Sequence, residues 1–512
     1  MSTSTARPGA TGGDSARVPP AVAARAALRL PYTHVNDVFV DGEWTPALGT
    51  GRNTVTDPAT GEVWGSVADG TGDDVDRAVA AARRAFDTGR WPRLTPTERA
   101  AYLGRIADEI ERRSEDIALT NTRENGSPVA ESRGAAANAS GIFRYFATLA
   151  DHLEREDVRP FPSGIGESVV RREPVGVCGL IAPWNFPINL MVIKLAPALL
   201  AGCTVVMKPA SPTPLSFRLI VDAVAAAGVP SGVVNLVTGS GRLGDALVRH
   251  PGVDKVAFTG STPVGRKIAA AAGELLRPVT LELGGKSSAI VLPDADLGAM
   301  SDILVRSCMR NTGQTCYISS RILAPASRYA EVVDMVTGTI AAGRQGDPLD
   351  PATVFGPSAT EAQYRTVLEY VESGRSEGAR ATTGGRAASL VGGLERGFFV
   401  EPTVFADVDP GMRISREEIF GPVLSILKYG DVDEAVALAN NTEFGLGGLV
   451  FGEDQDAALA VADRMDTGSV GINFFASNHS APFGGRHDSG LGTEYGPEGL
   501  AAYLSYKSIH RR

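Results

Sequence analysis

The sequence is poor in the side chains that build metal sites and disulfide frameworks. Its 512 residues include four cysteines, at positions 178, 203, 308 and 316, and six scattered histidines. No Cys-x-x-Cys pair occurs, so neither a zinc site nor a set of disulfides is supported. A buried cysteine is more often a small packing residue than a reactive one. We therefore expect no metal, reduced thiols and a cytoplasmic protein.

The chain also lacks the features of nucleic-acid and membrane binding. Its formal net charge is −10 and its pI about 5.3, and no basic stripe or aromatic-basic alternation occurs. No apolar run reaches the roughly 18 residues that a membrane helix needs. The longest, 190–202, is interrupted by Lys194, and the first 30 residues contain no signal-peptide core. Neither nucleic acid nor a membrane is expected as a partner.

Length and composition indicate a globular chain with two or three structural units. Residues 1–30, rich in Ala, Ser, Thr, Gly and Arg, are expected to form a disordered tail, although an organellar transit peptide has a similar composition. Structure is expected to begin near Tyr32. A strand and hairpin turn are predicted at 38–44, and helical patterns at 73–86 and over 97–149.

Strand-like and helical patterns alternate between residues 174 and 284. The predicted strands are 175–182, 204–208, 233–237, 255–259 and 279–283, and the predicted helices are 189–201, 215–227, 242–250 and 264–272. This order is typical of a mostly parallel sheet covered by helices on both faces, an α/β fold, whose ligands bind at the carboxyl ends of the strands. A second alternating region covers 288–473. A final strand at 501–509 is expected to be available for pairing with another chain.

A glycine-rich turn at 239–244 matches the dinucleotide-binding pattern GxGxxG, after a predicted strand and before a predicted helix. The match is weak by itself, because tight strand-to-helix turns use glycine for other reasons. The acidic residue expected about 20 positions later is not clearly placed. Gly285-Lys286-Ser287 lacks the earlier glycine of a phosphate-binding Walker loop.

Stronger signals follow one another along the chain, the first four at predicted strand ends. They are Ile181-Ala182-Pro183-Trp184-Asn185-Phe186-Pro187, Met207-Lys208-Pro209, Phe258-Thr259-Gly260-Ser261-Thr262, Leu281-Glu282-Leu283-Gly284-Gly285-Lys286, Gly313-Gln314-Thr315-Cys316, Glu417-Glu418-Ile419-Phe420-Gly421-Pro422 and Pro482-Phe483-Gly484-Gly485. Together these motifs resemble those of the aldehyde dehydrogenase superfamily, from about residue 38 to the C-terminus. Any one of them can arise by chance, but seven in the family's order do not.

The resemblance implies a fold and a division of the chain. It implies a Rossmann-type parallel-sheet cofactor domain over residues 31–150 and 172–284, and a second α/β catalytic domain over 285–485. A small oligomerisation strand arm is implied for 151–171 and 486–512. A homodimer or homotetramer follows, because an unpaired strand edge is a liability unless another subunit covers it.

The resemblance implies three catalytic residues, and aldehyde oxidation requires such groups. An aldehyde loses hydride readily only after a nucleophile has added to its carbonyl, and Cys316 is the implied nucleophile. The Asn185 amide and the Cys316 backbone N–H are the implied oxyanion donors. Glu282 is the implied base that activates water to hydrolyse the thioester. The alternatives are a packing role for Cys316, a turn-forming role for Asn185, and an exposed strand-end charge at Glu282.

The resemblance also implies an NAD or NADP site along the strand ends. Lys208 and position 211 would lie beside the adenosine ribose, and Glu418 and Phe420 beside the nicotinamide ribose and ring. The other implied cofactor residues are Ile181, Trp184, Ser211, Gly241, Gly260, Ser261 and Gly265, of which the last three place the pyrophosphate near a helix N-terminus. Lys194 is either a catalytic support residue or a solvated lysine, and Glu417-Glu418 can alternatively be a solvated charge run.

Ser211 departs from the pattern of many NAD⁺-preferring relatives, which carry a glutamate three residues after the ribose-binding lysine. A glutamate accepts a hydrogen bond from the 2′-hydroxyl of NAD⁺ and repels the 2′-phosphate of NADP⁺. Serine is neutral and can donate to phosphate, and Lys208 and Arg242 add positive charge at the same corner. We therefore expect both NAD⁺ and NADP⁺ to be used.

The substrate pocket is expected to be apolar or aromatic, which favours an uncharged, hydrophobic or aromatic aldehyde. Its predicted lining residues are Phe186, Leu190, Ile193, Tyr317, Ile318 and Phe483. Position 193, where succinate-semialdehyde relatives tend to carry arginine, is isoleucine. Two alternatives stay open. One is a CoA-acylating semialdehyde dehydrogenase, a branch that usually lacks the base glutamate; the other is an inactive binding protein on the same fold.

Overall fold

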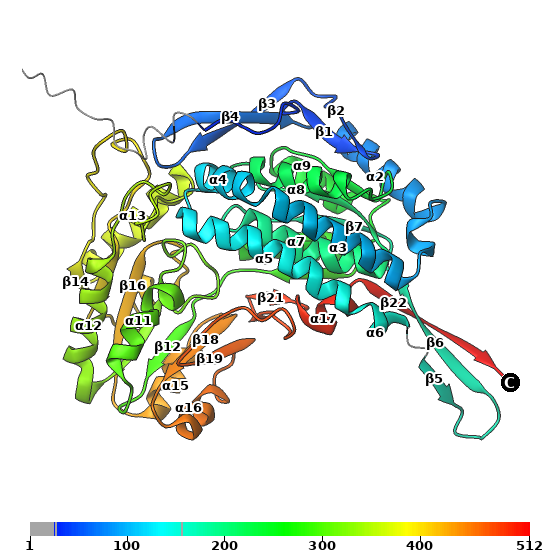
Figure 1. Cartoon of the computed structure of the whole chain (residues 1–512). Helices are drawn as coiled ribbons and strands as arrows, with labels where there is room; N and C mark the ends of the chain where they lie inside the picture. The colour runs from blue at the N-terminus through cyan, green and yellow to red at the C-terminus, as the bar shows by residue number, and fades with distance from the viewer. Residues whose placement is uncertain (1–24, 26–27, 155–156) are drawn as a thin grey trace, which may run out of the picture.

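Two large, mostly parallel sheets organise the chain, and a three-stranded arm projects from them (Figure 1). The computed structural model describes residue 25 and residues 28–154 and 157–512. The expected disordered tail, 1–30, therefore lies mostly outside the described residues. Arg25, which is described, is buried and forms ion pairs with Asp57 and Asp347.

The first sheet has eight strands in the order β2-β1-β9-β8-β7-β10-β11-β21. Their bounds are β1 (Asp37–Val40), β2 (Glu43–Pro46), β7 (Val177–Ile181), β8 (Thr204–Lys208), β9 (Val234–Leu236), β10 (Lys255–Thr259), β11 (Val279–Glu282) and β21 (Gly490–Leu491). The five central strands, β9 to β11, run parallel, and antiparallel strands close both edges. The predicted parallel sheet is confirmed.

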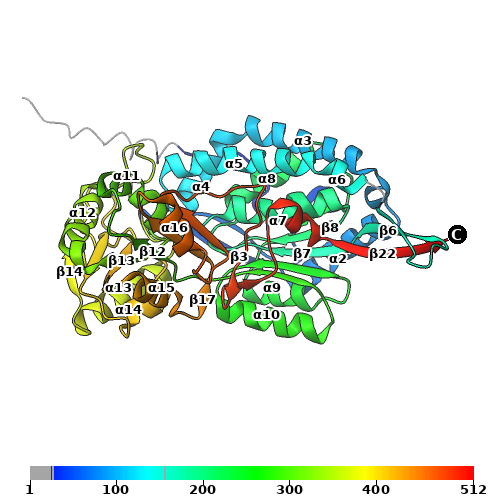
Figure 2. The same ribbon diagram turned by 90° about the horizontal axis from the view of Figure 1, so that it is seen from below.

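Helices bury both faces of this sheet, so neighbouring residues of one strand enter different cores. Val205 and Met207 of β8 pack with one set of helices, and Val206 packs with the other. Figure 2 shows α3 and α5 on one side of β7 and β8 and α9 and α10 on the other. The helices around this sheet are α2 (Gly72–Asp87), α3 (Pro96–Arg112), α4 (Ser114–Asn125), α5 (Val129–Thr148), α6 (Ala150–Glu154), α7 (Pro187–Ala201), α8 (Leu215–Ala226), α9 (Gly241–Arg249), α10 (Thr262–Glu274) and α17 (Gly496–Ala501).

The second sheet has seven strands in the order β14-β15-β16-β13-β12-β18-β19. All neighbouring pairs are parallel except the edge pair β14–β15. Its elements are β12 (Ser288–Val291), α11 (Leu297–Cys308), β13 (Arg321–Pro325), α12 (Tyr329–Ala342), α13 (Glu361–Ser376), β14 (Arg380–Thr383), β15 (Thr403–Ala406), α14 (Arg413–Arg416), β16 (Val423–Tyr429), α15 (Val432–Asn440), β18 (Gly447–Phe451), α16 (Gln455–Ala462) and β19 (Ser469–Ile472). The second alternating region of the sequence thus forms a second α/β layer. No helix in the described part of the chain is long and apolar enough to span a membrane.

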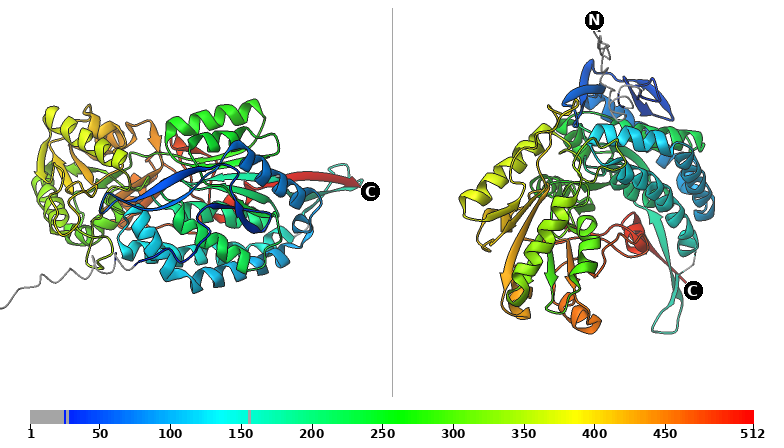
Figure 3. Two further views of the ribbon diagram at one scale, coloured as in Figure 1. Left: turned by 90° about the horizontal axis from the view of Figure 1, so that it is seen from above. Right: turned by 60° about the vertical axis from the view of Figure 1, so that its left-hand side comes forward.

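The arm consists of β5 (Asp157–Pro160), β6 (Glu167–Pro174) and β22 (Leu504–Arg511), in the order β22-β6-β5 (Figures 1 and 3). The last strand begins at Leu504 rather than at 501, because α17 occupies the chain up to Ala501. Residues 486–503, which were expected in the arm, instead supply β20 (Arg486–His487), β21 and α17. There β20 pairs with β17 (Phe444–Gly445) and β21 pairs with β11.

A separate two-stranded ribbon, β3 (Gly51–Asp57) and β4 (Glu62–Asp69), lies over the first sheet and its helices (Figures 1 and 3). Val55 and Val67 of the ribbon pack against Leu215, the first residue of α8. The ribbon therefore rests beside the loop that joins β8 to α8. Its end, at Asp69 and Gly70, lies against the turn before α9, where Gly70 N donates to the Thr238 carbonyl at 2.8 Å.

Candidate active site

The carboxyl ends of the central strands lie side by side in register. Ile181 pairs with Lys208, and Thr259 pairs with Glu282. The chain order reverses between β7 and β10, and such a switch point is where open α/β sheets bind ligands. A cavity of about 250 Å³ lies beside it. Its lining includes Trp184, Asn185, Gly260, Ser261, Gly284, Cys316, Glu418 and Phe420, most of which the sequence had assigned to the cofactor or to catalysis.

The loop that carries Cys316 follows α11 and is held in an unusual conformation. Asn311, Thr312 and Gly313 all have positive φ angles. A side chain on Gly313 would lie 2.0 Å from the carbonyl oxygen of Gly421, so only glycine fits there. This close approach ties the nucleophile loop to the loop of Glu418 and Phe420. The Cys316 residue itself stays partly accessible.

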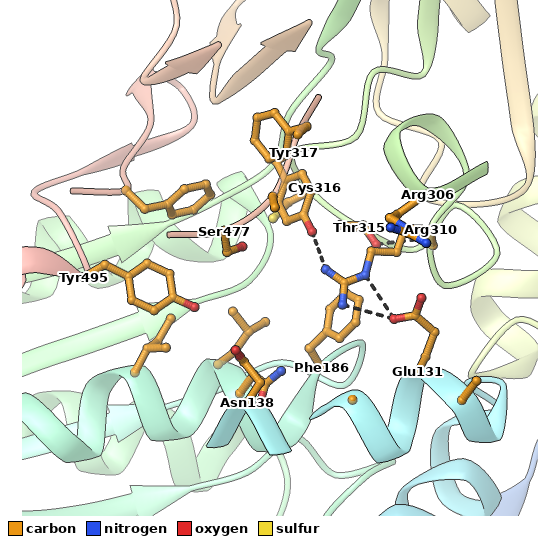
Figure 4. Close-up of a pocket in the computed structure, with 18 residues that line it drawn as sticks. Glu131, Asn138, Phe186, Arg306, Arg310, Thr315, Cys316, Tyr317, Ser477 and Tyr495 are labelled. Carbon is orange, nitrogen blue, oxygen red and sulfur yellow. Dashed lines mark hydrogen bonds and ion pairs between the residues drawn. The ribbon is translucent and has the colours of Figure 1, made fainter. Parts of the chain in front are cut away.

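A second cavity, of about 440 Å³, also contains Cys316 in its wall (Figure 4). The predicted substrate residues Phe186, Leu190, Ile193, Tyr317 and Phe483 all line it, and Phe475 and Tyr495 add further aromatic surface. Ile318, also predicted, is buried and is not among the lining residues. Cys316 is thus common to two cavities, one lined by the predicted cofactor residues and the other mostly apolar or aromatic.

Asn185 is buried, and its position is fixed by other amides. Its side-chain nitrogen donates to the Gln314 carbonyl at 3.0 Å, and its own carbonyl accepts from the side chains of Asn125 and Asn311, each at 3.1 Å. One of its two N–H bonds remains for a ligand. The sequence prediction missed Asn125 and Asn311, although Asn311 lies only two residues before the Gly313–Cys316 motif.

Glu282 is the last residue of β11 and is buried. Neither carboxylate oxygen has a hydrogen-bond partner within the described residues. Burial raises the pKa of Glu282 well above its ordinary value; the Glu494 charge raises it further, and the Lys194 charge opposes the rise. Lys194 Nζ lies 2.5 Å from Glu494 Oε1 and 2.6 Å from Thr259 Oγ1. Lys194 is therefore not a solvated lysine, and Glu494, which the sequence prediction missed, belongs to the same buried cluster.

Burial also raises the pKa of the Cys316 thiol, as do the charges of Glu418 and Glu282. The backbone N–H groups of Cys316 and Tyr317 have the opposite effect. These N–H groups lie close enough to favour negative charge at the sulfur. The thiol is consequently protonated at neutral pH until a further positive charge or a base acts on it.

The predicted nicotinamide residues lie together at the first cavity. Glu418 Oε1 accepts from Gly285 N at 3.0 Å, and burial raises the Glu418 pKa to about 7 against the opposing effects of Gly285 and Lys286. A side chain on Gly284 would lie 2.4 Å from Glu418 Oε2. The rings of Trp184 and Phe420 meet edge to face at 5.4 Å. A carboxylate and an aromatic wall of this kind fit a ribose and a flat ring.

The predicted adenosine and pyrophosphate residues surround the neighbouring strand ends. Lys208 is buried, which lowers its pKa to about 8 although the Asp69 charge opposes this. Gly241 opens α9 with free space around it, and Ser261 is exposed before α10. Gly265 has a packing reason of its own, because a side chain there would lie 2.5 Å from Leu283 Cδ2. The donors and spaces present fit a dinucleotide.

Residues 44–509 match the model of the aldehyde dehydrogenase family. The chain belongs to this family. The resemblance predicted from the seven motifs is confirmed, and so is the fold. The chain is an NAD(P)-dependent aldehyde dehydrogenase that oxidises an aldehyde to the acid, which excludes the inactive binding protein.

Three relatives of this aldehyde dehydrogenase cover nearly its whole length. Geranial dehydrogenase from Castellaniella defragrans is 50% identical over 484 residues, which are 94% of this chain and 99% of the relative. Aldehyde dehydrogenase from Mycobacterium tuberculosis, solved with NAD⁺, is 43% identical with a TM-score of 0.90, covering 93% of this chain and 97% of that one. A mutant of aldehyde dehydrogenase C from Pseudomonas syringae, solved with NAD⁺ and octanal, is 42% identical with a TM-score of 0.90, covering 94% and 98%.

Proposed function

We propose that this aldehyde dehydrogenase oxidises uncharged, hydrophobic aldehydes through a thioester on Cys316. The observation that carries the proposal is that Cys316 borders two cavities, one for a dinucleotide and one with a mostly apolar or aromatic lining. The 50% identical relative is a geranial dehydrogenase, and a 42% identical relative was solved with octanal. Both aldehydes are uncharged and largely hydrocarbon.

The proposed reaction begins when Cys316 Sγ adds to the aldehyde carbonyl. The thiol releases its proton to solvent water, a carbon–sulfur bond forms as the carbonyl π bond breaks, and the carbonyl oxygen becomes an oxyanion that accepts from Asn185 Nδ2 and the Cys316 N–H. NAD⁺, when bound, supplies the hydride acceptor. Loss of hydride leaves the acyl group joined to Cys316 as a thioester. Overall, aldehyde, water and NAD⁺ give the acid, NADH and one proton.

Glu282 is proposed to complete the cycle by accepting a proton from the water that attacks the thioester. A carboxylate with a raised pKa suits this task, because it is a stronger base than an exposed glutamate. Its oxygens have no partner among the described side chains, so both are available to water. Lys194 and Glu494 lie next in this buried cluster and provide a route for the proton away from Glu282.

The acidic limb of the kcat–pH profile is expected to shift in opposite directions in two variants. Glu494→Gln removes a negative charge that raises the pKa of Glu282, so the limb should move to lower pH. Lys194→Met removes the positive charge that lowers this pKa, so the limb should move to higher pH. Steady-state rates between pH 5 and 10 at saturating octanal measure both. A shift of the same sign in the two variants, or none, contradicts the proposed role of the cluster.

One wall of the substrate cavity is polar, a feature that the sequence did not predict. Arg310 donates to the Tyr317 hydroxyl at 2.6 Å and to Glu131 at 3.1 Å, and its guanidinium lies 5.1 Å from the centre of the Phe186 ring (Figure 4). The charge of Arg310 is thus balanced by Glu131. Its effect is to hold Tyr317 and Phe186, two of the aromatic walls, in fixed positions beside Cys316.

A panel of aldehydes tests the proposed substrate class. Initial rates of NADH formation should give kcat/KM values for octanal and geranial at least about 10²-fold above those for succinic semialdehyde and betaine aldehyde, because desolvation of a charged chain is unfavourable in a mostly apolar cavity. Addition of coenzyme A should leave the rates unchanged. A preference for either charged aldehyde contradicts the proposed substrate class, and a requirement for coenzyme A supports the acylating alternative.

We also propose that residues 31–150 and 172–284, which contain most of the first sheet and its helices, form the cofactor domain and that 285–485 form the catalytic domain. The arm is proposed to join subunits. Tyr506 and Ile509 are exposed on β22, and its outer edge has no partner within the described chain. Sedimentation at micromolar concentration should show a dimer or tetramer, and a monomer would refute this assembly. The cytoplasmic location remains a prediction.

A further inference from the structure

The glycine-rich turn at 239–244, which lacked an acidic partner in the sequence, receives one from a distant part of the chain. Asp69 is the last residue of β4 and is half-buried. Its Oδ1 accepts from the Ser240 N–H at 3.2 Å, and a side chain on Gly239 would lie 3.1 Å from the same oxygen. The acid is thus supplied by the β3–β4 ribbon, about 170 residues before the turn.

The structure holds Asp69 firmly in this position. On either side of it, the Ala68 carbonyl accepts from Thr238 Oγ1 at 2.7 Å and Gly70 N donates to the Thr238 carbonyl at 2.8 Å. The end of β4 is therefore clamped to the turn by three hydrogen bonds, counting the one to Ser240. Asp69 Oδ2 makes no hydrogen bond to any residue that the structure describes, and so remains available to a ligand.

Ser211, in contrast, is already engaged at this corner. Its hydroxyl donates to the Gly239 carbonyl at 2.9 Å, and its own carbonyl accepts from Asn53 Nδ2 at 2.6 Å. The hydroxyl can donate to a phosphate only by giving up the bond to Gly239. Donation from the Ser211 hydroxyl was one ground for expecting dual cofactor use; the absence of a glutamate at position 211 and the charges of Lys208 and Arg242 were the others.

From this arrangement we infer that Asp69 supplies the negative charge that discriminates NAD⁺ from NADP⁺. The inference rests on the proposed dinucleotide site between Lys208 and the turn. The Asp69 carboxylate accepts a hydrogen bond from the 2′-hydroxyl of NAD⁺ and repels the 2′-phosphate of NADP⁺. Lys208 and the exposed Arg242, at the first turn of α9, would attract that phosphate if the carboxylate were neutral.

The effect of the Asp69 charge on Lys208 supports this placement. Burial lowers the pKa of Lys208, and Asp69 is the charged group that opposes the change. A negative charge that affects the pKa of Lys208 also affects a cofactor phosphate that binds beside this lysine. Asp69 takes part in none of the bond changes at Cys316. Its inferred role is therefore in the choice of cofactor and not in catalysis.

Asp69→Asn isolates the charge from the structure, because asparagine keeps an oxygen that can accept from Ser240. Calorimetric titration of the full-length enzyme with NAD⁺ and with NADP⁺, without aldehyde, gives the two dissociation constants. The wild type should bind NAD⁺ more tightly than NADP⁺. Asp69→Asn should reduce the ratio of the NADP⁺ dissociation constant to the NAD⁺ dissociation constant by at least about tenfold, mainly through tighter NADP⁺ binding. The kcat/KM ratio for the two cofactors should change in parallel.

Two variants serve as controls. Asp69→Glu keeps the charge and should keep the preference for NAD⁺. Glu62→Gln removes a charge at the other end of β4 and should leave the ratio unchanged, which excludes an effect of net charge alone. A wild type that binds both cofactors equally, or an Asp69→Asn ratio within about twofold of wild type, overturns the inference while leaving the proposed function intact. A wild type that binds neither cofactor contradicts the proposed function itself.

Discussion

Replacement of Cys316 by alanine is expected to reduce kcat/KM for octanal by on the order of 10⁴-fold or more, because no covalent adduct can form. Cys316 is the one cysteine of the chain that is not buried, and it borders both cavities. NADH formation measures the loss. Because alanine only shortens the side chain, NAD⁺ binding should persist, which shows that the site is still folded.

The other three cysteines provide matched controls. Cys178 lies in β7, Cys203 lies between α7 and β8, and Cys308 ends α11; all three are buried. Alanine at each should alter stability without abolishing turnover, because none of them lines either cavity. Near-wild-type activity of Cys316→Ala, or loss of activity only in Cys308→Ala, would contradict the proposed nucleophile.

Glu282→Gln is expected to separate the two halves of the reaction. In rapid mixing with octanal and NAD⁺, the variant should form about one NADH per active site in a burst. It should then turn over about 10²–10⁴-fold more slowly than wild type, because the base that activates water is absent. The burst is retained because hydride leaves before water attacks.

An exposed carboxylate that takes part in no proposed step gives the comparison for Glu282. Glu417 is exposed and pairs with Arg413 and Tyr370, so Glu417→Gln should behave like wild type in both phases. If Glu282→Gln loses the burst and the steady state equally, Glu282 acts in the first half of the reaction instead. If coenzyme A alone restores its turnover, the acyl-transfer alternative regains support.

The strand ends of the first sheet were predictable because each carries its own motif. Trp184, Lys208, Gly260 and Glu282 follow or end short apolar strands, and parallel strands bring such ends to one edge. The Gly-Gln-Thr-Cys turn was equally predictable, since it follows a helical pattern. Local sequence was sufficient wherever a residue's role depends on its position at the end of an element.

Contacts between distant segments were not predictable in the same way. Lys194 and Glu494 are 300 residues apart and meet only because α17 packs beneath α7. Asp69 reaches the turn at 239–244 from a ribbon whose own pattern says nothing about ligands. Arg310 was unpredictable for another reason: a charged residue in an aromatic wall requires a partner, and Glu131 comes from α5. Buried and half-buried polar contacts of this kind become visible only in the folded chain.

The state of Cys316 during turnover tests the central claim most directly. Glu282→Gln, mixed with octanal and NAD⁺ and quenched in acid after the burst, can be digested and its peptides analysed by mass spectrometry. The peptide that contains Cys316 should carry one octanoyl group, with Cys178, Cys203 and Cys308 unmodified, and the adduct should not form without NAD⁺. An unmodified Cys316 after a full burst of NADH, or an acyl group on another residue, would contradict the thioester mechanism.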